Sequence, residues 1–108
     1  MISKELMSEV LNLNITYIEH CNNSIVYKIS VYDREEEVNI YELAHKCKEW
    51  AFIRGYKIES KINEDSCQSH TIKRSYLCDE DWAICFCCET EPEAIFKACQ
   101  WILDNKDK

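Results

Sequence analysis

The sequence contains a single glycine, Gly55, and this scarcity constrains the fold more than any other feature. Gly55 follows Arg54 at the end of a segment with helical periodicity, where glycine favours the left-handed backbone that ends a helix. At the other end of this segment Asn39 is followed three positions later by Glu42, the capping-box pattern of a helix start. The sequence therefore predicts a helix over Ile40–Arg54 and excludes a glycine-rich phosphate-binding loop.

The apolar positions of this helix recur every three or four residues, so one face is predicted to pack on a sheet. A second helix is predicted at the C-terminal end of the chain. There Thr90 and Glu93 repeat the capping pattern, and Pro92 lies in the first turn, where its missing N–H costs nothing. The predicted buried face of this second helix consists of Ile95, Ala98, Cys99 and Ile102, widened by Phe96 and Trp101.

The N-terminal part of the chain predicts a short helix followed by a β-hairpin. Ser3 can cap the helix, which is expected to end near Asn12. An extended segment then begins at Ile15, and alternating apolar residues continue the strand pattern over Ser24–Asp33. The residues 21–23 between them tolerate the backbone of a tight turn. The charged segment Asp33–Glu37 is predicted to be a loop.

Three further strands are predicted between the two longer helices. Tyr56–Ile62 alternates as a half-buried strand, His70–Leu77 has a weaker strand pattern, and Trp82–Cys88 is apolar in both of its rows. The last pattern indicates a central strand covered on both faces. We therefore expect one α+β domain over residues 1–108, in the order α-β-β-α-β-β-β-α. A four- to five-stranded, mainly antiparallel sheet with helices packed on it in a layered sandwich fits this order best.

Two of these segments resemble the phage ABA sandwich domain, a family of small phage and prophage proteins. One segment runs from Ile40–Ala44 through Trp50-Ala51 to Gly55-Tyr56, and the other is Thr90–Ile95 followed by Ala98. The resemblance covers about two thirds of the chain from Val38 onward and leaves residues 1–37 and 63–81 unmatched. It implies a phage-derived origin and a layered helix–sheet–helix fold, and it supplies no known activity or site.

Charge and composition restrict the class of partner. The formal net charge is −7, which repels phosphate backbones and argues against direct binding of nucleic acid. A host protein with a basic surface is the expected partner. The N-terminus lacks the pattern of a secretion signal and no segment has the apolar length of a membrane span, so we expect a cytoplasmic protein without membrane contact.

The eight cysteines raise the possibility of a metal or thiol site. The candidate ligands are Cys85, Cys87 and Cys88, with Cys78 upstream and the Cys67-x-x-His70 pair nearby. Alternation along a strand would turn Cys88 away from the other two, and zinc sites favour ligand pairs in turns. Reduced thiols are expected in a cytosolic protein, and the predicted helix places Cys47 and His45 on different faces. We therefore predict no metal, no cofactor and no catalytic residue.

The acidic residues are the predicted partner-binding site. They form two short runs, Glu35, Glu36 and Glu37 and then Asp79, Glu80 and Asp81. The resulting hypothesis is a non-enzymatic protein that modulates or inhibits a host protein, for example one in a nucleic-acid-handling or defence system, through an acidic surface. A cysteine-rich metal or redox domain and a self-associating structural protein, such as a homodimer, are the alternatives.

Overall fold

The computed structural model describes residues 2–31, 34–62, 64, 66–73 and 81–105, with the backbone alone described for residues 69, 70, 72, 73 and 81–84. Within these residues, three helices and six strands follow one another along the chain. They are α1 (Lys4–Leu11), β1 (Ile15–His20), β2 (Ser24–Ile29), β3 (Glu35–Asn39), α2 (Ile40–Ile53), β4 (Tyr56–Ile62), β5 (Cys67–Lys73), β6 (Asp81–Cys88) and α3 (Glu91–Asn105).

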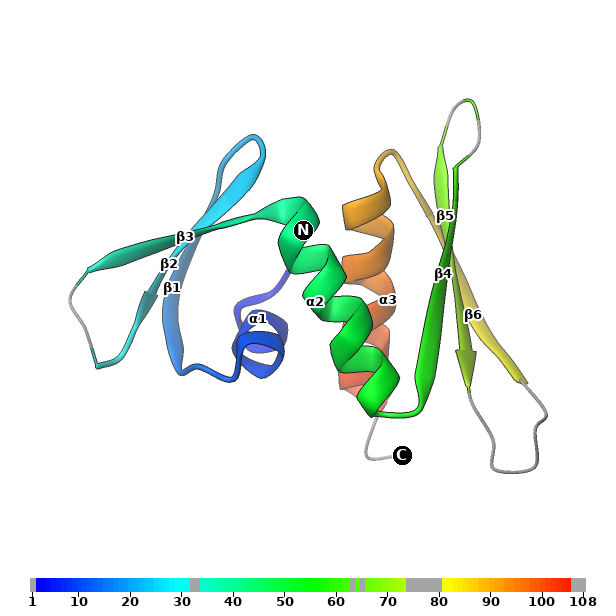
Figure 1. Cartoon of the computed structure of the whole chain (residues 1–108), viewed down its shortest axis with the longest axis horizontal. Coiled ribbons are helices and arrows are strands. Elements are labelled where there is room, and N and C mark those ends of the chain that lie inside the picture. The colour runs from blue at the N-terminus through cyan, green and yellow to red at the C-terminus, as the bar shows by residue number, and fades with distance from the viewer. Residues whose placement is uncertain (1, 32–33, 63, 65, 74–80, 106–108) are drawn as a thin grey trace.

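The strands form two separate antiparallel sheets. The N-terminal sheet has the order β1-β2-β3, and the C-terminal sheet has the order β4-β5-β6. Figure 1 shows the two sheets at opposite ends of the molecule with the helices between them. The molecule measures 46 × 34 × 19 Å, and its long axis runs from one sheet to the other.

The α+β class is thus confirmed, but two three-stranded sheets replace the predicted single sheet of four to five strands. The extra strand is β3, which lies largely where a charged loop was predicted. Three consecutive glutamates have low strand propensity. Antiparallel pairing with β2, in which Glu35 lies opposite Lys28 and Asn39 lies opposite Ser24, overrides that local preference. Because α2 follows β3 directly, the helix carries the chain from the first sheet to the second.

The prediction that Trp82–Cys88 is a central strand covered on both faces is wrong. Within the part of the chain that the structure describes, β6 pairs with β5 alone and forms one edge of the C-terminal sheet. Cys85 is half-buried and Cys87 is exposed, so the face of β6 that carries these two thiols is not covered. The central strand is β5, which begins at Cys67 rather than at His70, and the predicted continuation to residue 77 lies outside the described residues.

Side-chain caps fix the N-terminal ends of α1, α2 and α3 as the sequence predicts. Ser3 Oγ accepts a hydrogen bond from Leu6 N at 3.1 Å, and Asn39 Oδ1 accepts from Tyr41 N at 2.8 Å. Thr90 Oγ1 accepts from Glu93 N at 3.4 Å. Gly55 has a φ of 90° after the end of α2, which confirms the helix stop.

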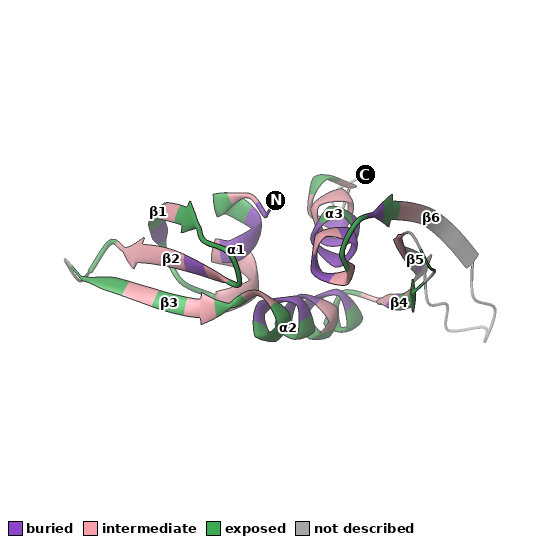
Figure 2. Cartoon of the chain, turned by 90° about the horizontal axis from the view of Figure 1, so that it is seen from above, coloured by how far each residue is buried: buried purple, intermediate pink, exposed green. Residues whose placement is uncertain are grey.

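One apolar core joins both sheets through the helices. α1 packs against β1 of the N-terminal sheet, α3 packs against all three strands of the C-terminal sheet, and α2 lies between them (Figure 2). Ile25 from β2 is fully buried in the core, and Ile58 contributes from β4. Ser3 Oγ also donates a 2.6 Å hydrogen bond to Gln100 Oε1, which ties the start of α1 to α3. None of the helices in the described residues is long and apolar enough to span a membrane.

Candidate functional site

The acidic residues predicted to bind a partner, as far as the structure describes them, belong to two separate sheets. Glu35, Glu36 and Glu37 lie in β3 of the N-terminal sheet, and Asp81 is the first residue of β6 in the C-terminal sheet. These two sheets lie at opposite ends of the molecule (Figure 1). Asp79 and Glu80 lie outside the described residues. Of the two runs, the one formed by Glu35, Glu36 and Glu37 lies wholly within the described residues.

The β3 glutamates are divided between the two faces of their sheet. Successive side chains in a strand point to opposite faces, so Glu35 and Glu37 point away from the core and Glu36 points toward the helix side. The exposures agree, because Glu35 and Glu37 are exposed and Glu36 is half-buried. Glu36 is also paired, since its Oε1 lies 2.9 Å from Arg34 Nε. Burial, with a smaller contribution from the charge of Glu36, raises the pKa of Tyr27 on this inner side.

The strand register assembles an acidic face on the outer side of the N-terminal sheet. We define the acidic face as Tyr17, Glu19, Lys28, Glu35 and Glu37. Lys28 of β2 lies opposite Tyr17 of β1 and opposite Glu35 of β3, and Val26 lies between Glu19 and Glu37. Three carboxylates therefore share this surface with one lysine. Within the described residues, neither Glu35 nor Glu37 forms an ion pair, so their charge is available to a partner.

Tyr17 adds an aromatic ring to the acidic face. The ring is 44% exposed, its hydroxyl donates a 3.3 Å hydrogen bond to Glu19 Oε2, and Lys28 Nζ lies 5.9 Å from its centroid. The negative charge of Glu19 raises the pKa of the Tyr17 phenol, and slight desolvation, the hydrogen bond and the charge of Glu35 act in the same direction. The phenol therefore remains a hydrogen-bond donor beside the carboxylates.

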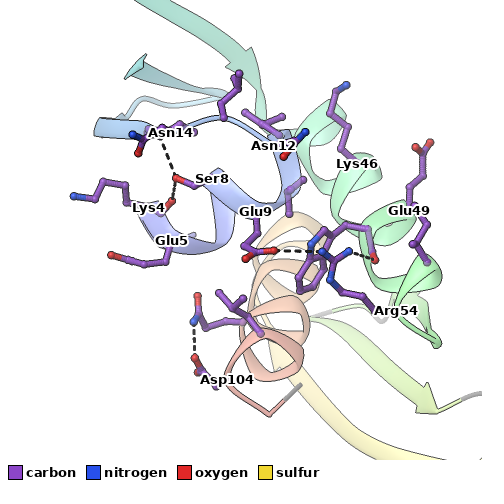
Figure 3. Close-up of a pocket in the computed structure, with 18 of the residues that line it drawn as sticks. Lys4, Glu5, Ser8, Glu9, Asn12, Asn14, Lys46, Glu49, Arg54 and Asp104 are labelled. Atoms are coloured by element: carbon purple, nitrogen blue, oxygen red, sulfur yellow. Dashed lines mark hydrogen bonds and ion pairs between the residues drawn. The ribbon is translucent and has the colours of Figure 1, made fainter. Parts of the chain in front are cut away.

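A second surface is the groove between α1 and the C-terminal halves of α2 and α3. Its volume is about 1530 Å³. Figure 3 shows Glu9 of α1 and Arg54, at the end of α2, reaching toward each other across it. Arg54 Nη2 lies 3.3 Å from Glu9 Oε2, and its guanidinium is stacked 4.3 Å from the centroid of Trp50. The cation at the centre of this groove is thus already paired with a carboxylate and an aromatic ring.

The charges around the groove nearly balance. Its lining contains three cations, Lys4, Lys46 and Arg54, and four carboxylates, Glu5, Glu9, Glu49 and Asp104. Positive and negative side chains are interspersed, so the groove does not select a ligand by the sign of its charge. The acidic face has three carboxylates and one lysine, so its charge has a definite sign, and this is why we treat it as the candidate functional site.

The outer face of the C-terminal sheet has a different balance of charge. Lys57, Glu59 and Lys61 alternate along β4 on the side away from α3, and Lys57 Nζ lies 3.1 Å from Glu59 Oε1. Two lysines thus accompany one glutamate on this strand. The same face contains Gln68 opposite Cys87. This surface lacks the excess of carboxylates found on the N-terminal sheet, within the side chains that the structure describes.

The strand thiols are distributed as the sequence predicts. Cys85 and Cys87 share one face of β6, and Cys88 is buried on the other, where it lies opposite Cys67 of β5. Cys87 Sγ lies 3.4 Å from Ser66 Oγ. Cys78 lies outside the described residues, and the side chain of His70 is not described. Among the side chains that are, no group of three or more His, Cys, Asp or Glu residues is placed to hold a metal.

A second pair of thiols lies between α2 and α3. Cys47 and Cys99 are fully buried, and Cys99 Sγ donates to the backbone oxygen of Cys47 at 3.4 Å. The interaction with Cys99 and the loss of hydration both raise the pKa of Cys47, which disfavours the nucleophilic thiolate. His45 is on the exposed side of α2, where its Nε2 lies 2.9 Å from Glu49 Oε1.

Sequence reasoning missed Tyr17, Glu19 and Lys28 as part of the candidate site. Alternation along the predicted hairpin does place Tyr17 and Glu19 on one face. It could not join them to Glu35 and Glu37, because the pairing of β2 with β3 was not predicted. The signal that could have found it is the Glu36/Val38 alternation, which is the inward row of β3.

Comparisons with known proteins supply no relative. No family model matches the chain, and no similar curated protein or solved structure was found. The resemblance to phage ABA sandwich domains therefore stays a prediction, and the functional argument depends on the geometry of the acidic face.

Proposed function

We propose that the protein is a phage- or prophage-encoded binding protein without catalytic activity. Its acidic face occupies a basic surface on a host protein and thereby modulates or inhibits that protein. The observation that supports this proposal is the presence of three carboxylates and one lysine on a sheet face that no helix of the described chain covers. Complementary potentials of this kind mainly increase the association rate and the specificity for oppositely charged partners.

Proteins that handle nucleic acid are the class of target that this surface fits best. Such proteins carry lysine and arginine in grooves that bind phosphate, and a fixed array of carboxylates can compete with phosphate for the same cations. Tyr17 supplies the type of side chain that often dominates the energy of an interface. A host defence nuclease or a DNA-binding regulator would be inhibited by occupation of its groove.

The decisive experiment compares two charge-reversal variants of the full chain. Glu35→Lys/Glu37→Lys removes the carboxylates of β3, and Glu59→Lys/Glu49→Lys makes the same change in charge at exposed positions outside the acidic face. Immobilised protein is exposed to bacterial lysate at low salt, and the retained proteins are identified. We expect a discrete basic protein to be retained by the wild type and by the control, and lost with the β3 variant.

Two further measurements test the electrostatic mechanism. Retention should fall steeply as salt is raised, because exposed charges are screened within about 10 Å at roughly 0.1 M ionic strength. Duplex DNA should displace the retained protein if both occupy one basic groove. Equal retention by all variants, with no effect of salt or DNA, would show that the acidic face is not the binding surface.

The two alternatives have their own measurements. A metal or redox domain should contain zinc or iron in stoichiometric amounts after purification without added metal, and a chelator should unfold it. A self-associating protein should sediment as a dimer at micromolar concentration. A metal-free monomer would leave the binding proposal as the remaining hypothesis of the three.

A further inference from the structure

The outer edge of β3 is an open sheet edge. The sheet order places β3 at one end of the N-terminal sheet, with β2 on its inner side. Figures 1 and 2 show no other element of the described chain alongside its outer side. The pairing with β2 continues through five consecutive residue pairs without a bulge. A strand edge of this kind presents backbone N–H and C=O groups that can pair with another chain.

One hydrogen bond determines which residues of β3 face that open edge. Ile40 N donates to Asn23 O at 3.0 Å, so this pair is a hydrogen-bonded pair of the antiparallel ladder. Hydrogen-bonded and non-hydrogen-bonded pairs alternate, so Val38 and Glu36 also bond toward β2. The backbone groups of Glu35 and Glu37 therefore point outward, away from β2.

The other side of the sheet gives the same alternation. Cys21 N donates to Ser24 O at 2.9 Å, so Ser24, and then Val26 and Lys28, bond toward β1. Ile25 and Tyr27 remain to bond toward β3, as the first hydrogen bond requires. The two independent contacts thus agree on which backbone groups of the sheet are free.

The residues with outward backbone groups are also the ones that carry the exposed carboxylates. Glu35 and Glu37 each offer an N–H, a C=O and a negative side chain at the same edge. A chain that pairs with this edge would place every second side chain beside these carboxylates. The residues between them would lie beside the half-buried row of Glu36 and Val38.

From this geometry we propose that β3 accepts an extended basic segment of the partner as a fourth strand of the N-terminal sheet. The segment has lysine or arginine at every second position, facing the acidic face, and small or apolar residues between them. Main-chain hydrogen bonds give such strand addition its affinity, and the alternate side chains give its specificity. This inference rests on the proposed function and names the form in which the partner is bound.

The negative charges of β3 disfavour pairing of its open edge with a second copy of this chain. Pairing two β3 edges would bring the glutamates of both copies together, and like charges across a strand pair are destabilising. The same charges could serve merely to protect the edge from aggregation. Protected edges are commonly interrupted by a bulge or a proline, whereas β3 is regular and contains no proline, and its one inward charge, Glu36, is paired with Arg34.

The test uses a short labelled peptide with lysine at every second position and valine or threonine between. Its binding to the full-length protein is measured by fluorescence anisotropy. The matched control is the same peptide N-methylated on alternate amides, which keeps every charge and removes the hydrogen bonds of one edge. We expect the control to bind about tenfold more weakly or worse, because each lost hydrogen bond costs about 1 kcal/mol.

Amide resonances locate the peptide on the protein. Binding should slow hydrogen exchange at Glu35 and Glu37, whose N–H groups point outward, and leave Glu36 and Val38 unchanged. Glu35→Lys/Glu37→Lys should abolish binding, while Glu59→Lys on the other sheet should not alter it. Sedimentation should show that the peptide binds to monomeric protein.

The outcomes separate this inference from the proposed function. If both peptides bind equally well and the β3 variant still abolishes binding, the acidic face binds cations without strand addition, and the inference is overturned while the function stands. If neither peptide binds but the partner is still lost with the β3 variant, strand addition is again overturned. If the β3 variant affects neither peptide nor partner, both proposals fail.

Discussion

The two sheets of this protein have the same number of strands and the same antiparallel connectivity, but their buried rows differ. The central strand of the N-terminal sheet, β2, buries Ile25, which is 0% exposed. The central strand of the C-terminal sheet, β5, buries Thr71, which is also 0% exposed. Thr71 Oγ1 has no hydrogen-bond partner among the described residues. One sheet thus contributes an apolar side chain to the core at the position where the other contributes a hydroxyl.

The outer faces differ in the opposite sense. Among the described side chains, Glu35 and Glu37 of the acidic face form no ion pair, whereas Glu59 of the C-terminal sheet is paired with Lys57. Among the side chains that the structure describes, the sheet whose central strand buries Ile25 thus carries the less balanced outer charge. Burial of Ile25 offsets the repulsion among surface carboxylates, so this sheet can keep a surface that is favourable for binding but not for stability.

The largest expected effect is the loss of the apolar contact made by β2. Ile25→Ala should lower the free energy of unfolding by about 2 to 5 kcal/mol, since it removes buried methyl groups and leaves a cavity. Chemical denaturation with circular dichroism measures the change. Ile62→Ala is the control, because Ile62 is 71% exposed and its truncation should cost less than about 0.5 kcal/mol.

This measurement also tests whether the sheets unfold together. Ile25 and Ile58 belong to one apolar cluster that includes residues of both sheets, so mutating either of them tests the prediction of one domain over residues 1–108. Ile58→Ala in the C-terminal sheet should therefore move the same single transition as Ile25→Ala. Two transitions, each sensitive to one variant, would mean that the two sheets are independent units.

The next effect concerns the buried thiols of Cys47 and Cys99, which lie between α2 and α3. The pKa of Cys47 is raised in the folded protein, so folding favours the neutral thiol. That contribution is complete below the pKa of an unfolded cysteine, about 8.5, and is lost as the pH rises above it. We expect stability to fall by about 1 kcal/mol per pH unit above roughly pH 8.5 because of this thiol.

Urea unfolding followed across this alkaline range measures the slope. Cys47→Ala should be less stable at neutral pH, yet its stability should decline less steeply with pH. An unchanged slope in that variant would show that the Cys47 thiol does not ionise with unfolding. Both sheets should be lost together at high pH, because Cys47 lies in α2 within the shared core.

A smaller effect should arise from the hydroxyl buried under the C-terminal sheet. Thr71→Val keeps the shape of the side chain and removes a polar group without a partner, so it should raise the free energy of unfolding by about 1 kcal/mol. Thr90→Val is the opposite control, because Thr90 Oγ1 accepts the capping hydrogen bond from Glu93 N. It should destabilise α3 by about 1 kcal/mol. If Thr71→Val destabilises the protein instead, the Thr71 hydroxyl forms a hydrogen bond in the folded protein.

The parts of the fold that follow from short-range patterns were predicted well. The three helices begin directly after Ser3, Asn39 and Thr90, because the side chains of these residues accept hydrogen bonds from backbone N–H groups of the first turn. This is a local effect that can be predicted from sequence. The stop at Gly55 is equally local, since a positive φ favours glycine.

The parts that depend on long-range pairing were not predicted. Both rows of Trp82–Cys88 are apolar in sequence, which is typical of a central strand, but position within a sheet depends on which strands pair, and this is not encoded in one segment. β3 was missed for the same reason, because its three glutamates are poor strand residues until β2 pairs with them. The candidate site was half predicted, since Glu35 and Glu37 were named while Tyr17, Glu19 and Lys28 join them only through the register.

The smallest expected effect tests the outer faces directly. Glu37→Gln removes one of the unpaired carboxylates near Glu19 and should raise the free energy of unfolding by a few tenths of a kcal/mol, or roughly 0.3 kcal/mol. Glu59→Gln on the other sheet breaks an exposed ion pair with Lys57 and should lower it by a similar amount. Thermal unfolding at low salt should resolve the two signs, and about 1 M salt should remove both effects by screening. If both variants shifted stability in the same direction, the N-terminal sheet would not be tolerating excess charge. The case that its carboxylates are kept for a partner would then lose its energetic basis.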